Sequence, residues 1–300
     1  MDLHSEIKKL NLPDSDSHKG KNGKLMVIGG SHFFHAASLW SLLIASRLVD
    51  LVHYSSVPEN NRIVARHKEE FRDGIVVPRI DIEKYIEEDD CVLIGPGMNR
   101  DDNPKISDYQ VTISNLEEIS KIENEGEQTY HLTKYLLTKY PKKRWVIDAG
   151  SLQMLELEWI PPNAILTPHF QEFERLVAKI KNPRMRDRFR PLLLEDQAKL
   201  FAREFHCIVI LKGKQDFVVS DTQFQVIEGG NAGMTKGGTG DVLAGLVSGL
   251  YCSNDPYLSA LAASYINKKA GEDLFQTVGY WFNASDLANQ IPKTMKSLLI

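Results

Sequence analysis

The sequence predicts an α/β fold in which helices cover both faces of a doubly wound, mostly parallel sheet. The first observation is a series of short, continuous apolar runs, such as residues 25–28 and 91–94, which are typical of strands buried on both faces. The second is that longer segments with apolar residues at helical spacing separate these runs. A helix that connects two neighbouring strands makes the strands parallel, so the alternation itself predicts a parallel sheet.

The expected elements follow one another in a regular order from residue 25 onward. Strands are expected at residues 25–28, 51–56, 75–77, 91–94, 145–148, 164–167 and 207–211, followed by a hairpin of 217–220 and 224–227. Helices are expected at residues 36–49, 152–157, 171–180, 195–205, 241–251, 257–275 and 284–291.

No linker interrupts this alternation, so residues 1–300 are expected to form one domain. Residues 1–17 are polar and contain Pro13, and they are expected to be an N-terminal extension. Residues 98–144 combine acidic stretches with ambiguous helical segments. They are predicted to be an exposed insertion, and the sequence assigns them no role.

Composition and charge exclude several classes of protein. A net charge of -4 provides no basic surplus for nucleic acid or for an acidic membrane surface. The most apolar window, residues 36–52, contains Arg47 and Asp50 and is too short to span a bilayer. The 3 cysteines are far apart in the sequence and form no metal-binding motif, which favours packed thiols in a reducing compartment. Because the N-terminus shows no secretory signal, a cytoplasmic protein is expected.

The glycine-rich stretch 231–245 leads into a predicted helix. Gly237, Gly238 and Gly240 leave backbone N–H groups open to an anion, and the start of a helix favours negative charge. Asp241 lies at this helix start, where its carboxylate would be held ionised beside a passing phosphoryl group, as suits a base that deprotonates a hydroxyl. The alternative is that Asp241 only caps its helix and the glycines only form a turn. The whole stretch favours phosphoryl transfer.

Small and polar residues also follow the predicted strands, at the edge where open α/β sheets bind ligands. These residues are Gly29-Gly30-Ser31, Gly95-Pro96-Gly97, Asp148-Ala149-Gly150, Thr167-Pro168-His169 and Lys212-Gly213. Each group alone could be a tight turn or a helix cap. Together with residues 237–241 at the same edge, they indicate a ligand site.

These motifs resemble those of the ADP/ATP-dependent NAD(P)H-hydrate dehydratases, which have a ribokinase-like fold. The resemblance extends from about His18 to the last helix. Its most specific elements are Thr-Pro-His-x-x-Glu at residues 167–172 and Gly-Gly-Thr-Gly-Asp at residues 237–241. The second element alone would indicate only the wider kinase superfamily.

The resemblance implies an enzyme that repairs NADH or NADPH whose nicotinamide ring has been hydrated. ADP or ATP, arriving with Mg²⁺, would phosphorylate the ring hydroxyl, and phosphate would then leave to restore the double bond. No fixed metal site is expected, because the sequence shows no cluster of His, Asp and Glu. The resemblance allows a homo-oligomer, and it implies that an epimerase for the hydrated dinucleotide would be a separate protein.

Roles for individual residues are also implied by the resemblance. Asp241 would be the catalytic base, and Gly238 and Gly240 would line the anion hole. The adenine nucleotide would be held by Lys212, Gly213, Lys214, Gln215, Asp216 and Gly240. The hydrated dinucleotide would be contacted by Ala37, Gly97, His169 and Asp241.

Two alternative functions remain open, and the chain departs from the family pattern in places. A small-molecule kinase of the same fold, acting on a vitamin-like alcohol such as a hydroxyethylthiazole or hydroxymethylpyrimidine, would keep Asp241; residues 167–172 argue against it. A non-catalytic nucleotide-binding module would not need an intact Asp241. Ala36 and Gln171 stand where the family usually has glycine, so a positive φ at either would be strained. Phe170 replaces the usual proline, and residues 98–144 are atypical of the family.

Overall fold

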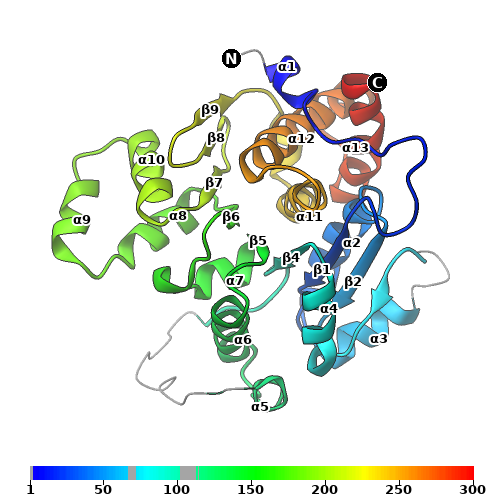
Figure 1. Ribbon diagram of the computed structural model, residues 1–300. Helices are drawn as coiled ribbons and strands as arrows, with labels where there is room; N and C mark the ends of the chain where they lie inside the picture. Colours follow the sequence, from blue (N-terminus) through cyan, green and yellow to red (C-terminus); the bar gives the residue numbers. More distant parts are fainter. Residues whose placement is uncertain (1–2, 67–71, 102–112, 114) are drawn as a thin grey trace.

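The computed structural model describes residues 3–66, 72–101, 113 and 115–300. Its centre is a nine-stranded sheet with the strand order β3-β2-β1-β4-β5-β6-β7-β8-β9 (Figure 1). The strands are β1 (Lys24–Ile28), β2 (Leu51–Ser55), β3 (Ile75–Val76), β4 (Cys91–Ile94), β5 (Arg144–Ile147), β6 (Ile165–Leu166), β7 (Ile208–Leu211), β8 (Asp216–Val219) and β9 (Phe224–Ile227). All neighbours from β3 to β7 are parallel, whereas β8 is antiparallel to both β7 and β9. The predicted mostly parallel sheet is confirmed.

Helices cover both faces of this sheet, as expected for a doubly wound fold. The α-helices are α1 (Leu3–Ile7), α2 (His35–Ala45), α3 (Pro58–Arg66), α4 (Ile82–Glu88), α5 (Leu116–Ser120), α6 (Glu125–Lys139), α7 (Ala149–Met154), α8 (Phe170–Ala178), α9 (Pro183–Phe189), α10 (Leu194–Glu204), α11 (Thr239–Tyr251), α12 (Pro256–Val278) and α13 (Ala284–Leu299). Short 3-10 turns are η2 (Arg79–Asp81), η3 (Leu157–Trp159) and η4 (Ala232–Thr235). Helices α2, α11, α12 and α13 pack on one face, and α4 to α10 pack on the other.

The continuous apolar runs form strands because both of their faces are buried. In β4, Cys91 and Leu93 pack in the core beneath α11, whereas Val92 and Ile94 pack in the core on the opposite face. All four side chains are fully buried. Burying a valine or leucine side chain contributes about 1.5–3 kcal/mol. The two cores therefore fix the sheet rigidly, and with it the positions of the residues that follow each strand.

Part of the segment 98–144, predicted to be exposed, is instead a helix that packs on the sheet. Helix α6 buries Leu132, Leu136 and Leu137 in the core that it shares with β4 and β5, so α6 is the crossover between these two parallel strands. Polar residues such as Thr129 and Thr133 are buried on the same helix and made its apolar stripe hard to recognise. Residues 102–112 and 114, which belong to the same prediction, lie outside the described residues.

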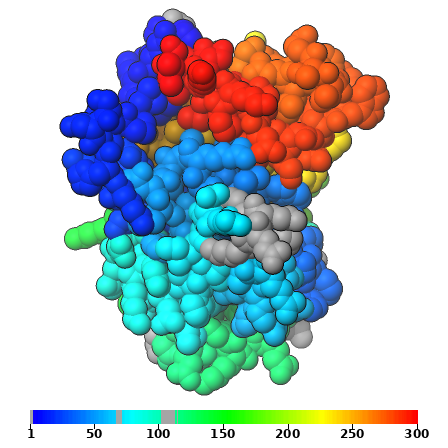
Figure 2. All heavy atoms as spheres, turned by 90° about the vertical axis from the view of Figure 1, so that its right-hand side faces the viewer, coloured from blue at the N-terminus to red at the C-terminus, as the bar shows by residue number. Residues whose placement is uncertain are grey.

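The N-terminal segment packs against the last helices, and Figures 1 and 2 both show it beside them. Ile7 of α1 is fully buried, and the backbone N–H of Asn11 donates to the side-chain oxygen of Asn254 at 2.7 Å. Helices α1, α3, α4 and α9 were not predicted from the sequence. Within the described ranges, no helix has the length and apolar character needed to cross a membrane.

Candidate active site

The turns that follow the parallel strands meet at one edge of the sheet. Backbone hydrogen bonds connect neighbouring turns: Gly30 N–H donates to the carbonyl of Pro96 at 2.7 Å, and Lys212 N–H donates to the carbonyl of Pro168 at 2.8 Å. Asp148 N–H donates to the carbonyl of Ile94 at 3.0 Å. The strand-end residues picked out in the sequence are therefore neighbours in the fold, at the edge where ligands of open α/β sheets bind.

The glycine loop, residues 236–240, also lies at this edge and leads into helix α11. Gly238 caps the helix with a φ of 95°, and a Cβ atom there would lie 2.3 Å from the ring of Trp40. Only glycine fits this position, because both the positive φ and the close ring exclude a side chain. Gly237 has open space around it, and Gly240 faces the Nζ atom of Lys212 at 3.4 Å from its Cβ position. An anion at the start of α11 would thus lie next to the Lys212 ammonium group.

Lys212 is partly buried and is surrounded by carboxylates. Its Nζ atom donates to Oδ1 of Asp148 at 3.2 Å, and the same oxygen accepts from the hydroxyl of Thr167 at 2.7 Å. Burial alone would lower the pKa of Lys212, but the charges of Asp148, Glu172 and Asp241 outweigh burial and raise this pKa. Lys212 is therefore a permanent cation at the centre of the site.

Asp241 lies in the first turn of α11 and is partly buried. Burial raises the pKa of Asp241 to about 7; the Asp148 carboxylate adds to the rise, and Lys212 opposes it. Burial therefore acts against the expectation that Asp241 is held ionised, and with this pKa the carboxyl group is partly protonated near neutral pH. An aspartate with a pKa near 7 is a stronger base than an exposed aspartate, which suits the abstraction of a proton from a hydroxyl.

His169 is the N-terminal cap of α8 and lies beside Lys212, with which it forms a parallel bridge. Its Nδ1 atom accepts the backbone N–H of Gln171 at 3.1 Å and that of Glu172 at 3.4 Å. Since Nδ1 is an acceptor, we infer that a neutral His169 carries its proton on Nε2, which lies 3.6 Å from Oε2 of Glu172. His169 is therefore arranged to donate a hydrogen bond rather than to act as a base.

The loop Lys212 to Asp216, predicted to hold the nucleotide, is shaped from within by Asp216. This buried carboxylate accepts from the backbone N–H of Gly213 at 2.9 Å and from Ser264 at 2.8 Å, and Lys268 pairs with it at 3.3 Å. Lys268 also donates to the carbonyl oxygens of Gly213 and Lys214 at 3.1 Å each. Lys214 and Gln215 are exposed. Asp216 thus positions the loop, and the exposed Lys214 and Gln215 are available to contact a ligand.

Ala37 and Gly97, the predicted substrate contacts, are also adjacent to each other. A Cβ atom at Gly97 would lie 2.9 Å from Cβ of Ala37 and 2.7 Å from the carbonyl oxygen of Phe34. The family departures at Ala36 and Gln171 cause no backbone strain, because both residues lie in helices and neither has a positive φ. The residue of this edge with a positive φ is instead Ala149, at 42°, directly after Asp148.

Glu125 is a residue of this region that the sequence did not reveal. Its Oε1 atom accepts the backbone N–H of His32 at 2.9 Å, and its Oε2 atom accepts a hydrogen bond from the side-chain amide of Asn99. Glu125 thereby fixes the turn after β1 to the turn after β4. It belongs to the segment interpreted as an exposed insertion, so no local signal connected it to the site.

The carboxylates around Lys212 do not form a metal site by themselves. Across the described ranges, no group of three or more His, Cys, Asp or Glu residues could hold a metal ion. Mg²⁺ commonly uses one or two carboxylates together with water and nucleotide phosphates. Asp148 and Glu172 offer carboxylates of that kind next to Lys212.

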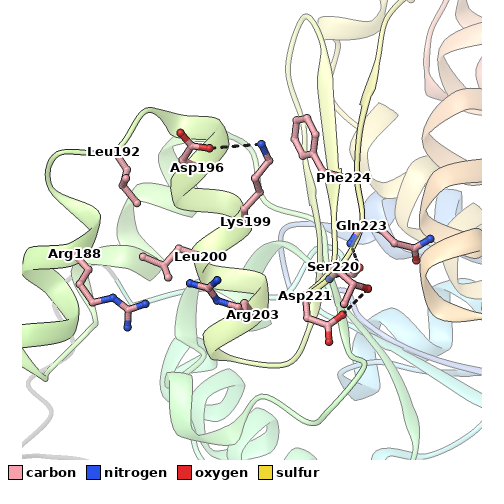
Figure 3. A pocket seen from close by; sticks show the side chains of 11 residues that line it. Arg188, Leu192, Asp196, Lys199, Leu200, Arg203, Ser220, Asp221, Gln223 and Phe224 are labelled. Atoms are coloured by element: carbon pink, nitrogen blue, oxygen red, sulfur yellow. Dashed lines mark hydrogen bonds and ion pairs between the residues drawn. The ribbon is translucent and has the colours of Figure 1, made fainter. Parts of the chain in front are cut away.

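A pocket of about 660 Å³ lies away from this edge, between α9, α10 and the turn from β8 to β9 (Figure 3). Figure 3 shows Arg188 and Arg203 on the helical side and Asp221 on the turn. Because β8 is antiparallel to β7, this turn lies at the edge of the sheet opposite Lys212. The pocket is therefore separate from the candidate active site.

Comparisons with known proteins agree with the fold and with the motifs. A family described as NAD(P)H-hydrate dehydratase matches residues 25–293. An ADP-dependent (S)-NAD(P)H-hydrate dehydratase from Nitrosopumilus maritimus is 34% identical over 94% of this chain and 91% of its own length. The bifunctional NAD(P)H-hydrate repair enzyme Nnr from Methanocaldococcus jannaschii is 30% identical over 97% of this chain and 52% of its own length. The chain thus spans about half the length of that relative.

Among solved structures, the chain is similar to the ADP/ATP-dependent NAD(P)H-hydrate dehydratase from Bacillus subtilis that was co-crystallised with ATP and Mg²⁺. The TM-score is 0.70 at 21% identity, covering 98% of this chain and 97% of the other. This likeness, shared with other proteins of the ribokinase-like superfamily, confirms the predicted ribokinase-like fold.

Proposed function

Because the chain belongs to the NAD(P)H-hydrate dehydratase family, we propose that it uses ADP or ATP to dehydrate hydrated NADH or NADPH and restore the reduced dinucleotide. The observation that carries the proposal is Asp241, with a pKa of about 7, at the start of α11 beside Lys212. This arrangement combines a base with two features that stabilise phosphoryl transfer, a cation and a helix N-terminus.

In the proposed reaction, Asp241 takes the proton of the ring hydroxyl as that oxygen attacks the terminal phosphorus of the nucleotide. Lys212 and the N–H groups near Gly238 and Gly240 stabilise the negative charge of the transferred group. Asp148 and Glu172 would hold Mg²⁺ together with the nucleotide, and the ion would supply positive charge to neutralise the phosphates. The C–O bond to phosphate then breaks, and loss of a proton from the neighbouring carbon restores the double bond.

The proposed ligand positions follow the two sides of the glycine loop. The nucleotide would lie on the side of residues 212–216, whose loop is held by Lys268. The hydrated dinucleotide would lie on the side of Ala37, Gly97 and His169, with its hydroxyl near Asp241.

We further propose that residues 1–300 form one catalytic domain in the cytoplasm and that a separate epimerase supplies the required epimer. We also propose that copies of this chain assemble into a homo-oligomer.

The deciding experiment supplies the protein with hydrated NADH, Mg²⁺ and either ADP or ATP, and follows the recovery of NADH absorbance. Asp241→Asn should reduce the rate by about 10²–10⁴-fold, because it removes the base, while nucleotide binding is retained. Asp221→Asn, on the remote turn between β8 and β9, is the matched control and should be fully active.

A small-molecule kinase is the competing function, and the same experiment separates it. If neither nucleotide restores NADH but the protein phosphorylates a panel of vitamin-like alcohols, the dehydratase proposal is wrong. A fully active Asp241→Asn variant would instead show that the assigned base is wrong.

A further inference from the structure

The exposed aromatic side chains of the described residues lie in segments near the active-site edge. They are Phe33, Phe34, Phe170, Phe275, Tyr280 and Trp281. Single exposed apolar residues are common on protein surfaces, but these six are not scattered over the molecule. Trp281 is the most exposed of them, with 85% of its surface accessible.

The position of Trp281 is fixed relative to the glycine loop. The turn after α12 and the first residue of α13, residues 279–284, contact the stretch 233–238 at three points. The ring of Phe282 packs against Gly233, the Nζ atom of Lys236 donates to the carbonyl oxygen of Tyr280, and Cβ of Ala284 lies 2.8 Å from the Cβ position of Gly238. Trp281 is therefore attached to the loop that would hold the phosphates.

The indole ring of Trp281 is oriented by the backbone beneath it. Gly279 has a φ of 62°, and a Cβ atom there would lie 3.2 Å from two carbon atoms of the indole. The ring thus rests on Gly279, and a larger residue would displace it. The neighbouring Tyr280 is different, because its ring packs against Phe275 with centroids 4.8 Å apart. Trp281 thus approaches Gly279 with two of its ring carbons and leaves most of its surface accessible to a ligand.

The helix that leads into the turn of Trp281 lines the predicted nucleotide side. Helix α12, which precedes the turn, contacts the nucleotide loop through Lys268 and contacts Gly230 N–H through Glu272 at 3.3 Å. Gly279 follows Glu272 by two helical turns, on the same side of the helix. The indole therefore lies at the end of the helix that lines this side.

We propose that Trp281 stacks on the adenine ring of the ADP or ATP co-substrate, an inference that rests on the proposed function. With its phosphates at the glycine loop, a bound nucleotide can direct its base toward the open face of the indole. Indole and purine are both flat aromatic rings, and such pairs stack face to face with an offset. Stacking recognises the ring face rather than its hydrogen-bonding groups, so Trp281 would favour a purine ring without reading its edge.

The test compares the nucleotide affinity of Trp281→Ala, Trp281→Phe and the unmodified protein. Trp281→Ala should raise both the KM and the Kd for ADP or ATP about tenfold, and Trp281→Phe should raise them less because it keeps an aromatic ring. Leu193→Ala is the control, since Leu193 is exposed to a similar degree, at 78%, on a different part of the surface. It should leave both constants unchanged.

Inorganic tripolyphosphate distinguishes the contribution of the adenine ring to binding from that of the phosphates. Its own inhibition constant should be the same in Trp281→Ala and in the unmodified protein, because it has no base. An unchanged Kd for ADP in Trp281→Ala would overturn the proposal. An increase only in the KM for hydrated NADH, or the dissociation of an oligomer, would also overturn it and assign Trp281 to the dinucleotide or to a subunit interface.

A direct measurement of ADP binding tests this inference separately from the proposed function. Quenching of Trp281 fluorescence by ADP alone, absent in Trp281→Phe, needs no hydrated dinucleotide and no turnover. A protein that binds ADP in this way but never restores NADH would retain the stacking contact and refute the dehydratase activity.

Discussion

The transfer end of the site, around Asp241, and the acceptor end, around Ala37 and Gly97, are held in place by different means. At the transfer end, charged groups are buried and paired: Lys212 donates to Asp148, and Asp216 is enclosed by Ser264 and Lys268. Each of these groups would be costly to bury alone, so the pairs specify one arrangement of the loops. The transfer end is therefore preorganised for a fixed reaction.

The acceptor end has few buried charges and more exposed surface. Phe33 and Phe34, in the turn before α2, are exposed by 76% and 57%. Hydrogen bonds hold that turn at the surface: Glu125 accepts the backbone N–H of His32, and Glu59 contacts the His32 ring. Exposed polar contacts of this kind contribute less than buried ones, so the turn can change shape at a lower cost than the transfer end. The contrast shows that the chemistry is fixed by buried electrostatics, whereas the fit to the acceptor depends on a turn held by more exposed contacts.

Apart from the loss of the base Asp241 itself, the largest effect is expected from removing the cation of the transfer end. Lys212→Met should reduce the transfer rate about 10²–10³-fold, because the developing phosphoryl charge loses its nearest ammonium group. It should also destabilise the fold by about 3–5 kcal/mol, since the Asp148 carboxylate would remain buried without its cationic partner and would keep only the hydroxyl of Thr167. Single-turnover kinetics measure the rate, and urea unfolding measures the stability.

Lys214→Met is the matched comparison, because Lys214 lies in the same loop but is exposed. It should raise the KM for nucleotide without changing the transfer rate. If Lys212→Met and Lys214→Met change the transfer rate and the stability to the same extent, the buried ion pair of Lys212 has no special role at the transfer end.

The second prediction is a pH dependence set by Asp241. Its pKa of about 7 means that the base form is lost as the pH falls below that value, so the transfer rate at saturating substrates should fall about tenfold per pH unit. Burial is the main cause of the raised pKa, and the Asp148 carboxylate is the next. Asp148→Asn should therefore move the acidic limb to lower pH, whatever it does to the maximal rate. An unmoved limb would mean that burial alone sets this pKa.

The same contrast explains what the sequence could predict. The strand ends were recognisable because Gly95-Pro96-Gly97 and Lys212-Gly213 directly follow apolar runs, so the signal is local. The pKa of Asp241 was not predictable, because it depends on Asp148, which reaches it only through the packing of different strands. Sequence pattern alone favoured an ionised Asp241, since the helix start is visible in the sequence and burial is not.

Polar residues buried within helices also limited what the sequence could predict. The pattern of α6 was obscured because Thr129 and Thr133 are buried beside its leucines, and Glu125 at its start was hidden with it. Helix α1 was not predicted for a similar reason: Ile7 enters the core from a mostly polar stretch. Local residue patterns thus predicted the transfer end better than the contacts that hold the acceptor end.

The smallest effect is expected from Glu125→Gln, which tests the acceptor end directly. Glutamine keeps the shape of glutamate but replaces one acceptor oxygen with an N–H₂ donor, so either His32 N–H or the Asn99 amide loses its partner. We expect the turn to loosen and the KM for hydrated NADH to rise about three- to tenfold, in line with the roughly 1 kcal/mol of a typical hydrogen bond. The KM for nucleotide and the transfer rate should stay the same. Glu117→Gln, on exposed α5, controls for the loss of an acidic charge. An equal rise in both KM values would show that the two ends of the site are not independent.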